Sequence, residues 1–138
     1  MRRKRYILTN RAAIDLREAR AWSRARWGKA LTNRYFDDLH KGAQYIAERH
    51  ASLGGRHDLA GGTALLLHPV REHYLVYEPL NDQFVVIVAV IRQRRDIPAI
   101  LQKWAEPIRR ELTEIRAAIE SGEISLPAGR GRYSRKKT

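Results

Sequence analysis

Basic side chains gather around two predicted strands, where they could form a binding surface. Arg71 and His73 lie two residues apart in an alternating segment, so they share one face of a strand. Arg92, Arg94 and Arg95 follow an apolar run and could extend that face from the adjoining strand. The result would be a small cationic patch that faces RNA or a protein target. The alternative is that His73 packs beside neighbouring helices and that the arginines keep a strand end soluble.

The sequence offers no other arrangement typical of catalysis or of metal and cofactor binding. It contains no cysteine, which excludes disulfides and thiolate metal sites. We find no Ser/His/Asp arrangement, no paired carboxylates in a plausible cleft and no glycine-rich phosphate loop. Gly61-Gly62 is interpreted as a tight turn. We expect no metal and no cofactor, because the other histidines are widely scattered: His40, His50, His57 and His68.

The formal charge of +12 is concentrated at the two ends of the chain. Residues 1–5 and 128–138 hold nine basic side chains and no acidic one, whereas residues 6–127 have a net charge of only +3. We interpret residues 123–138 as a basic, disordered tail, solvated or folded onto an acidic protein partner. No signal peptide or membrane-length apolar run is visible, so a cytoplasmic protein without a membrane partner is expected.

The N-terminal half predicts a strand followed by a helix hairpin. Residues 4–9 favour a β-strand, and Asn10 is a good N-cap for the next element. Helical spacing then runs over residues 11–27 and 29–49, and Gly28 interrupts it. Two amphipathic helices joined there form an αα-hairpin. The expected inner faces consist of Ala12, Leu16, Ala19, Ser23 and Trp27, and of Leu31, Tyr35, Leu39, Gly42, Ala43 and Ile46.

Three strands are predicted after a glycine-rich crossing at residues 53–62. Residues 63–68 are apolar and are expected to end at Pro69, and residues 71–78 alternate. Residues 84–91 have no polar face, so they should form a central strand covered on both sides.

A last helix is predicted from Asp96-Ile97-Pro98, because aspartate and proline favour the first helical turn. Pro107 removes a backbone hydrogen bond, and we expect a break there. The apolar stripe beyond it would expose a large apolar surface if the helix stood free. We expect it to pack on the helix hairpin, the alternatives being a second copy of the chain or a partner. This stripe consists of Ile108, Leu112, Ile115 and Ile119.

Together these elements predict one α+β domain. Its antiparallel sheet of about four strands is packed on an N-terminal helix hairpin, and an extra C-terminal helix follows. The length of 138 residues, 43% of them hydrophobic, suits a single core.

Several short segments carry a family resemblance over roughly residues 4–103. They are Tyr6-Ile7-Leu8-Thr9, Ala13, Asp15-Leu16, Trp27-Gly28, His73-Tyr74-Leu75-Val76-Tyr77 and Asp96-Ile97-Pro98. In this order, and with the predicted order of elements, they resemble the RelE/ParE family of bacterial toxins. The resemblance divides the chain into a toxin domain at residues 1–103, a helical extension at 104–122 and the basic tail at 123–138.

The family contains two activities, one of which is ribonucleolytic. RelE-like members use basic residues on the exposed sheet face, with an aromatic residue near the C-terminus, to cleave messenger RNA in the ribosome. Here Leu65 and Leu67 stand at the two lysine positions, Tyr74 at the strand arginine and Ile100 at the late tyrosine. Leucine can neither transfer a proton nor stabilise developing negative charge. We therefore lean against an enzyme, and Arg94, which does match, is the one candidate catalytic residue.

ParE-like members poison DNA gyrase by protein contact, and an antitoxin wraps an extended helical segment around them. The resemblance therefore implies a toxin of growth arrest and plasmid stabilisation, held in a toxin–antitoxin hetero-oligomer. We expect the target to bind the cationic patch defined above: Arg71, His73, Arg92, Arg94 and Arg95. The antitoxin is expected on the first helix at Ile14, Trp22 and Ala25, where an aromatic residue could anchor it; packing of Trp22 on the C-terminal extension is the alternative.

Two other functions remain open from the sequence. The first is a ribosome-dependent messenger-RNA endonuclease that uses Arg94. The second is a basic nucleic-acid-binding module whose charged tails clamp a duplex, with salt-dependent affinity.

Overall fold

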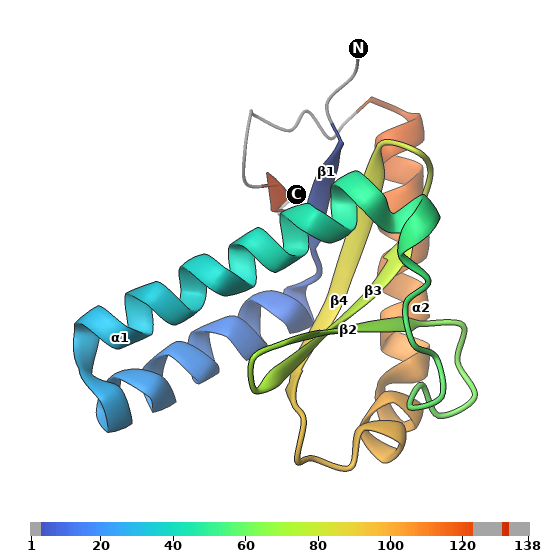
Figure 1. Cartoon of the computed structure of the whole chain (residues 1–138). Coiled ribbons are helices and arrows are strands. Elements are labelled where there is room, and N and C mark those ends of the chain that lie inside the picture. The colour runs from blue at the N-terminus through green and yellow to red at the C-terminus, as the bar shows by residue number, and fades with distance from the viewer. Residues whose placement is uncertain (1–3, 123–130, 133–138) are drawn as a thin grey trace, which may run out of the picture.

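The computed structural model describes residues 4–122 and 131–132 and has three layers (Figure 1). A helix hairpin covers one face of a sheet and a C-terminal helix covers the other. This is the predicted α+β fold with its extra C-terminal helix. No helix in the described ranges is long and apolar enough to cross a membrane. The elements are β1 (Arg5–Leu8), α1 (Asn10–Leu53), β2 (Leu66–Val70), β3 (His73–Pro79), β4 (Phe84–Arg92), α2 (Ile97–Glu120) and β5 (Gly131–Arg132).

The predicted helix hairpin is confirmed, and α1 consists of its two arms. Gly28 separates them with φ 80 and ψ 175, in the left-handed region that favours glycine. The N-cap is Thr9 and not Asn10, because the Thr9 hydroxyl accepts the Ala12 N–H at 3.0 Å. Leu31 was expected on the inner face but is 53% exposed. The tip of the hairpin projects beyond the sheet (Figure 1), so the sheet cannot cover it.

The sheet has the order β2-β3-β4-β1-β5. Its four predicted strands, β1 to β4, are mostly antiparallel. β2, β3 and β4 form the expected antiparallel meander, and β1 lies parallel to β4. The prediction that Pro69 ends the first meander strand is wrong. Pro69 lies inside β2, and β2 is an edge strand, where a missing N–H need not break the sheet.

β5 pairs in parallel with β1 at the other edge of the sheet. It lies within residues 123–138, the segment predicted to form a basic, disordered tail. The rest of that segment lies outside the described residues.

The prediction that β4 is covered on both faces is confirmed. Val85, Ile87 and Val90 belong to the apolar cluster that the hairpin shares with the sheet. Val86 and Val88 belong to a second cluster on the opposite face, together with the apolar stripe of α2. A strand without a polar face is stable here because each face meets its own helical layer.

Two expectations about α2 are wrong. The helix continues through Pro107 without a break. Pro107 is exposed, and buried residues on both sides of it, Leu101 and Ile108, pack into one cluster. The buried stripe of the helix also packs on the sheet and not on the hairpin, whose apolar faces are buried against the opposite side of the sheet. The start of α1 meets α2 through polar and stacking contacts, such as that between Asn10 and Glu111. The buried residues of α2 are Ile97, Leu101, Ile108, Leu112, Ile115 and Ala118.

The packing of α2 predicts a large effect of truncating one of its buried side chains. Ile115 is fully buried beneath the sheet, so Ile115→Ala should lower the free energy of unfolding by about 2–5 kcal/mol. Urea unfolding followed by circular dichroism measures this. Leu31→Ala at the exposed hairpin tip is the matched control and should change stability by less than about 0.5 kcal/mol. Equal stability of the two variants would contradict the packing.

Candidate binding cleft between the hairpin, β4 and α2

A cleft of about 530 Å³ opens where the first arm of α1, the end of β4 and the start of α2 meet. Its apolar part includes Ala89 and Ile91 of β4 and Leu101 and Ile108 of α2. Charged and aromatic side chains line the remainder: Arg11, Asp15, Glu18, Trp22, Arg92, Arg95, Lys103 and Trp104. The cleft therefore combines an apolar lining with a cluster of cations.

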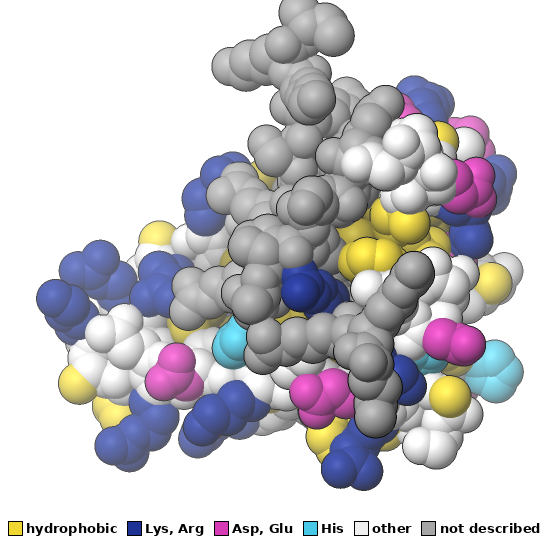
Figure 2. Space-filling view, turned by 90° about the horizontal axis from the view of Figure 1, so that it is seen from above, with side chains coloured by type: hydrophobic (Ala, Val, Ile, Leu, Met, Phe, Trp, Pro, Cys, Tyr) yellow, Lys and Arg dark blue, Asp and Glu magenta, His cyan; other side chains and the backbone are white. Residues whose placement is uncertain are grey.

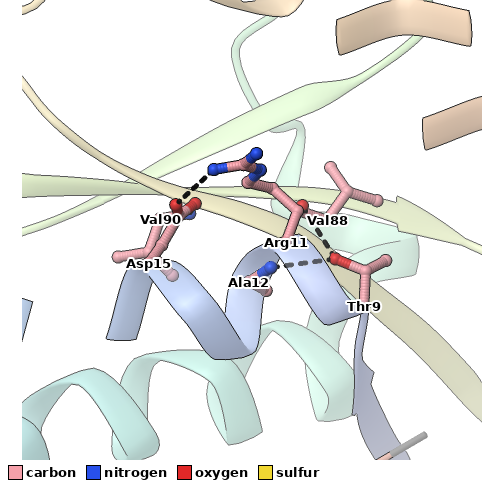
Figure 3. Close-up of polar contacts among 6 residues, drawn as sticks. All are labelled: Thr9, Arg11, Ala12, Asp15, Val88 and Val90. Atoms are coloured by element: carbon pink, nitrogen blue, oxygen red, sulfur yellow. Dashed lines mark hydrogen bonds and ion pairs between the residues drawn. The ribbon is translucent and has the colours of Figure 1, made fainter. Parts of the chain in front are cut away.

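Thr9 and Asp15 hold the first arm of α1 against β4 (Figure 3). β1 ends at Leu8, so β4 loses its strand partner on that side. The Thr9 hydroxyl donates to the Val88 carbonyl at 2.9 Å, and the Asp15 carboxylate accepts the Val90 N–H at 3.0 Å. These two side chains replace the missing strand and set the wall of the cleft.

Asp15 is an acidic group whose side chain is largely buried. Its side chain is 17% exposed, and burial raises the pKa of the carboxyl to about 6. The Val90 N–H and the Arg11 guanidinium, 3.6 Å away, oppose this rise in pKa without cancelling it. Asp15 therefore titrates much closer to neutral pH than an ordinary aspartate.

Two arginines of the cleft lie over tryptophan rings. The Arg92 guanidinium lies 4.4 Å from the centre of the Trp22 ring, and Arg11 lies 4.1 Å from that of Trp104. Such stacking orients a guanidinium while leaving its N–H groups at the edge available for an anion. Within the described residues, Arg92, like Arg95 and Lys103, has no acidic partner at ion-pair distance. The cleft can thus bind a carboxylate or phosphate.

His73 also borders the cleft, but it is buried and cannot contribute an exposed cation. Its Nδ1 shares a short hydrogen bond with the Tyr35 hydroxyl, which also accepts the Glu72 N–H at 3.2 Å. Burial lowers the pKa of the imidazole, and the nearby Arg92 acts in the same direction. The burial of His73 and its bond to Tyr35 agree with the alternative interpretation of the sequence, in which His73 packs beside the hairpin.

The five residues of the predicted target-binding patch do not share one surface. Arg92 and Arg95 line the cleft and His73 lies in its wall. Arg71 is not on a strand but in the β2–β3 turn, where it pairs with Asp38. Arg94 is exposed in the turn after β4 and does not line the cleft. A role of any of them in target binding stays a prediction.

The structure brings one residue of the predicted antitoxin site into the same cleft. Trp22 is half-buried, stacks edge-on against Trp27 with ring centres 5.3 Å apart, and lies beneath Arg92. Ile14 is partly buried and Ala25 is exposed on the same arm. The role of these residues in binding an antitoxin also stays a prediction.

Sequence reasoning missed four residues of this region: Arg11, Asp15, Tyr35 and Trp104. Asp15 belongs to a segment that carries the family resemblance. Its role in the cleft could not be predicted, because it depends on a hydrogen bond with Val90 of β4, 75 positions away. Trp104 entered the sequence analysis only as the first residue of the predicted helical extension. Within the described residues, no group of three or more His, Cys, Asp and Glu side chains could hold a metal ion.

The fold is a small α+β domain with a cleft between the hairpin, β4 and α2. A model of the family described as "ParE toxin of type II toxin-antitoxin system, parDE" matches residues 6–97. The chain belongs to this ParE toxin family. It is a ParE-type toxin of a type II toxin–antitoxin system, as the sequence resemblance predicted.

A solved structure supports the fold. A chain of the "Chromosomal ParDE TA system from P. aeruginosa" superimposes with a TM-score of 0.56 at 12% sequence identity. The alignment covers 64% of this chain and 95% of that one. No match to a curated protein sequence was found. The family match ends at residue 97, where α2 begins, so α2 lies almost wholly beyond the matched region.

The raised pKa of Asp15 predicts that Asp15→Asn stabilises the protein at neutral pH. Folded Asp15 keeps its proton up to about pH 6, whereas the unfolded chain releases it near pH 4. Ionisation of Asp15 therefore destabilises the fold increasingly as the pH rises through this window. Asparagine still accepts the Val90 N–H without carrying a charge. The gain in unfolding free energy should be about 3 kcal/mol at neutral pH and should vanish below about pH 4.

Urea unfolding of both proteins across this pH range measures the difference. Asp15→Ala is the control, because it removes the same charge but leaves the buried Val90 N–H without its acceptor, and it should be less stable than Asp15→Asn at every pH. If Asp15→Asn were less stable than the parent at neutral pH, the Arg11 ion pair would outweigh desolvation.

Proposed function

We propose that this toxin poisons DNA gyrase by protein contact, and that a protein antitoxin neutralises it. The observation that carries the proposal is the burial of the sheet face under α2. Leu65, Leu67 and Tyr74 occupy positions where RelE-like nucleases have basic groups, and all three are buried in the cluster shared with α2. A poison that acts by contact needs an accessible binding surface and no catalytic groups on that face.

The cleft supports a contact mechanism because its cations are available to a partner. Arg92 and Arg95 lie beside an apolar lining, an arrangement suited to an acidic group on a protein surface. Trp22 in the same cleft connects the predicted target surface with the predicted antitoxin surface. An antitoxin that covers Trp22 would then also block the arginines, which accounts for neutralisation by simple occlusion.

Biochemical assays with the purified chain test the proposed target. In the presence of gyrase and plasmid DNA, the toxin should trap cleaved DNA, and it should leave ribosome-bound messenger RNA intact. Expression alone should arrest bacterial growth, and the antitoxin from the adjacent reading frame should relieve the arrest. Cleavage of message at the ribosome without trapped DNA would establish the nuclease alternative instead.

Removing the free cations of the cleft should weaken the toxin. The double substitution Arg92→Gln with Arg95→Gln should raise the toxin concentration needed for half-maximal trapping of cleaved DNA by about tenfold. Arg109→Gln with Arg110→Gln, both exposed on α2, makes the same charge change outside the cleft and should have little effect. An equal loss in both double variants would show that only overall charge matters.

Arg94→Ala separates the two mechanisms further. Arg94 lies outside the cleft, so its removal should weaken toxicity only in part, because a contact poison distributes binding over several groups. Growth-arrest and message-cleavage assays on the folded variant measure this. Complete loss of both activities with unchanged stability would favour a nuclease that depends on Arg94.

A further inference from the structure

The positive charge of the body is concentrated at the tip of the hairpin. Residues 17–34 hold six basic side chains and one acidic one, a net charge of +5, although residues 6–127 together carry only +3. The rest of the body is therefore slightly acidic. Figure 2 shows Lys and Arg side chains gathered at the left, where the hairpin projects. All six are exposed: Arg17, Arg20, Arg24, Arg26, Lys29 and Arg34.

These cations lack carboxylate partners within the part of the chain that the structure describes. None of the six forms an ion pair there. Arg20 bonds the Asn33 side chain at 3.1 Å and stacks on Phe36, and Arg26 stacks on Trp22. Exposed charges of one sign usually repel one another and are interspersed with the opposite sign on a surface that has no partner. This clustering is typical of an interface with an acidic partner.

An open hollow of about 320 Å³ lies beside the tip. Trp27, Tyr35 and Leu31 provide its apolar lining, and Arg34, Arg71 and Glu72 are its charged residues. Arg71 is already paired with Asp38, so Arg34 is the cation of the hollow that no described carboxylate pairs with. Leu31 is 53% exposed and is one of the two large hydrophobic side chains described as exposed. The hollow has room for an apolar side chain, and the cations of the tip suit acidic neighbours of that side chain.

The backbone at the rim of the hollow is held in an unfavourable conformation. Arg71 is the only described non-glycine residue with a positive φ, at 51 degrees. Glycine or asparagine would adopt this conformation at lower cost. The residue here is an arginine, and the Arg71 guanidinium lies 5.8 Å from the centre of the Tyr35 ring. Strained residues of this kind concentrate at binding sites, where their side chains are needed.

We infer that the tip of the hairpin is a docking surface, separate from the cleft, for an acidic protein segment that inserts an apolar side chain between Trp27, Leu31 and Tyr35. The apolar lining favours a protein over a nucleic acid, because a phosphate backbone would gain nothing from an exposed leucine. Lys29 and Arg34 contact the acidic side chains of the segment. This inference does not depend on gyrase being the target.

Peptide binding to the full chain tests the inference. The probe is a synthetic labelled helical peptide with leucine on one face and glutamate on the other, and fluorescence anisotropy reports binding. Lys29→Gln with Arg34→Gln should raise Kd by about tenfold and flatten its salt dependence. Leu31→Ala should raise Kd by about fivefold without changing the salt dependence. Both variants alter exposed residues, and unchanged melting temperatures verify that they fold.

Controls separate this surface from general charge attraction. Arg109→Gln with Arg110→Gln should leave Kd within about twofold of the parent, and a peptide with glutamate but no leucine should bind about fivefold more weakly. Equal binding of the two peptides, or equal loss in the tip variant and the α2 variant, would overturn the inference. So would tighter binding of a duplex DNA oligonucleotide with the same dependence on Lys29 and Arg34, which would assign the tip to nucleic acid.

Discussion

The backbone of β4 must find hydrogen-bond partners while both of its faces are buried under apolar side chains. β3 supplies them along one edge, but β1 reaches only as far as Leu8 on the other. Thr9 and Asp15 then satisfy Val88 and Val90 from the first turns of α1. To make these bonds, α1 must begin directly after β1 and lie against the end of β4. The position of the hairpin, and with it the cleft and the projecting tip, follows from these bonds.

The second layer decides which surfaces remain available. α2 covers the sheet face opposite the hairpin, and it lies almost wholly beyond the region that the family model matches. A ParE-type core would otherwise expose Leu67, Val76 and Val88, which are apolar here and need a cover. The helix α2 therefore closes one face of the sheet and leaves the cleft at its margin and the hairpin accessible. His73 is buried from the other side of the sheet, where its imidazole meets Tyr35 of the hairpin.

Local sequence patterns predicted the helices and strands better than they predicted which side chains are buried and what those side chains contact. The glycine at position 28 and the apolar run of β4 specified the hairpin and the doubly covered strand, because each depends on nearby residues alone. The exposure of Leu31 could not be predicted, since helical spacing cannot show where the sheet beneath a helix ends. The helix through Pro107 and the strand through Pro69 also depend on neighbours distant in the sequence. Asp15 in the cleft was missed for this reason.

The distribution of tryptophan has a practical consequence. The chain contains three, and all of them lie at the surfaces discussed above: Trp22 and Trp104 in the cleft and Trp27 in the tip hollow. Trp22 and Trp104 each carry a stacked guanidinium, and Trp22 and Trp27 meet edge to face. Their ultraviolet emission is therefore sensitive to whatever displaces those arginines or fills the hollow. Intrinsic tryptophan fluorescence can therefore report on both sites, and no other tryptophan contributes to the signal.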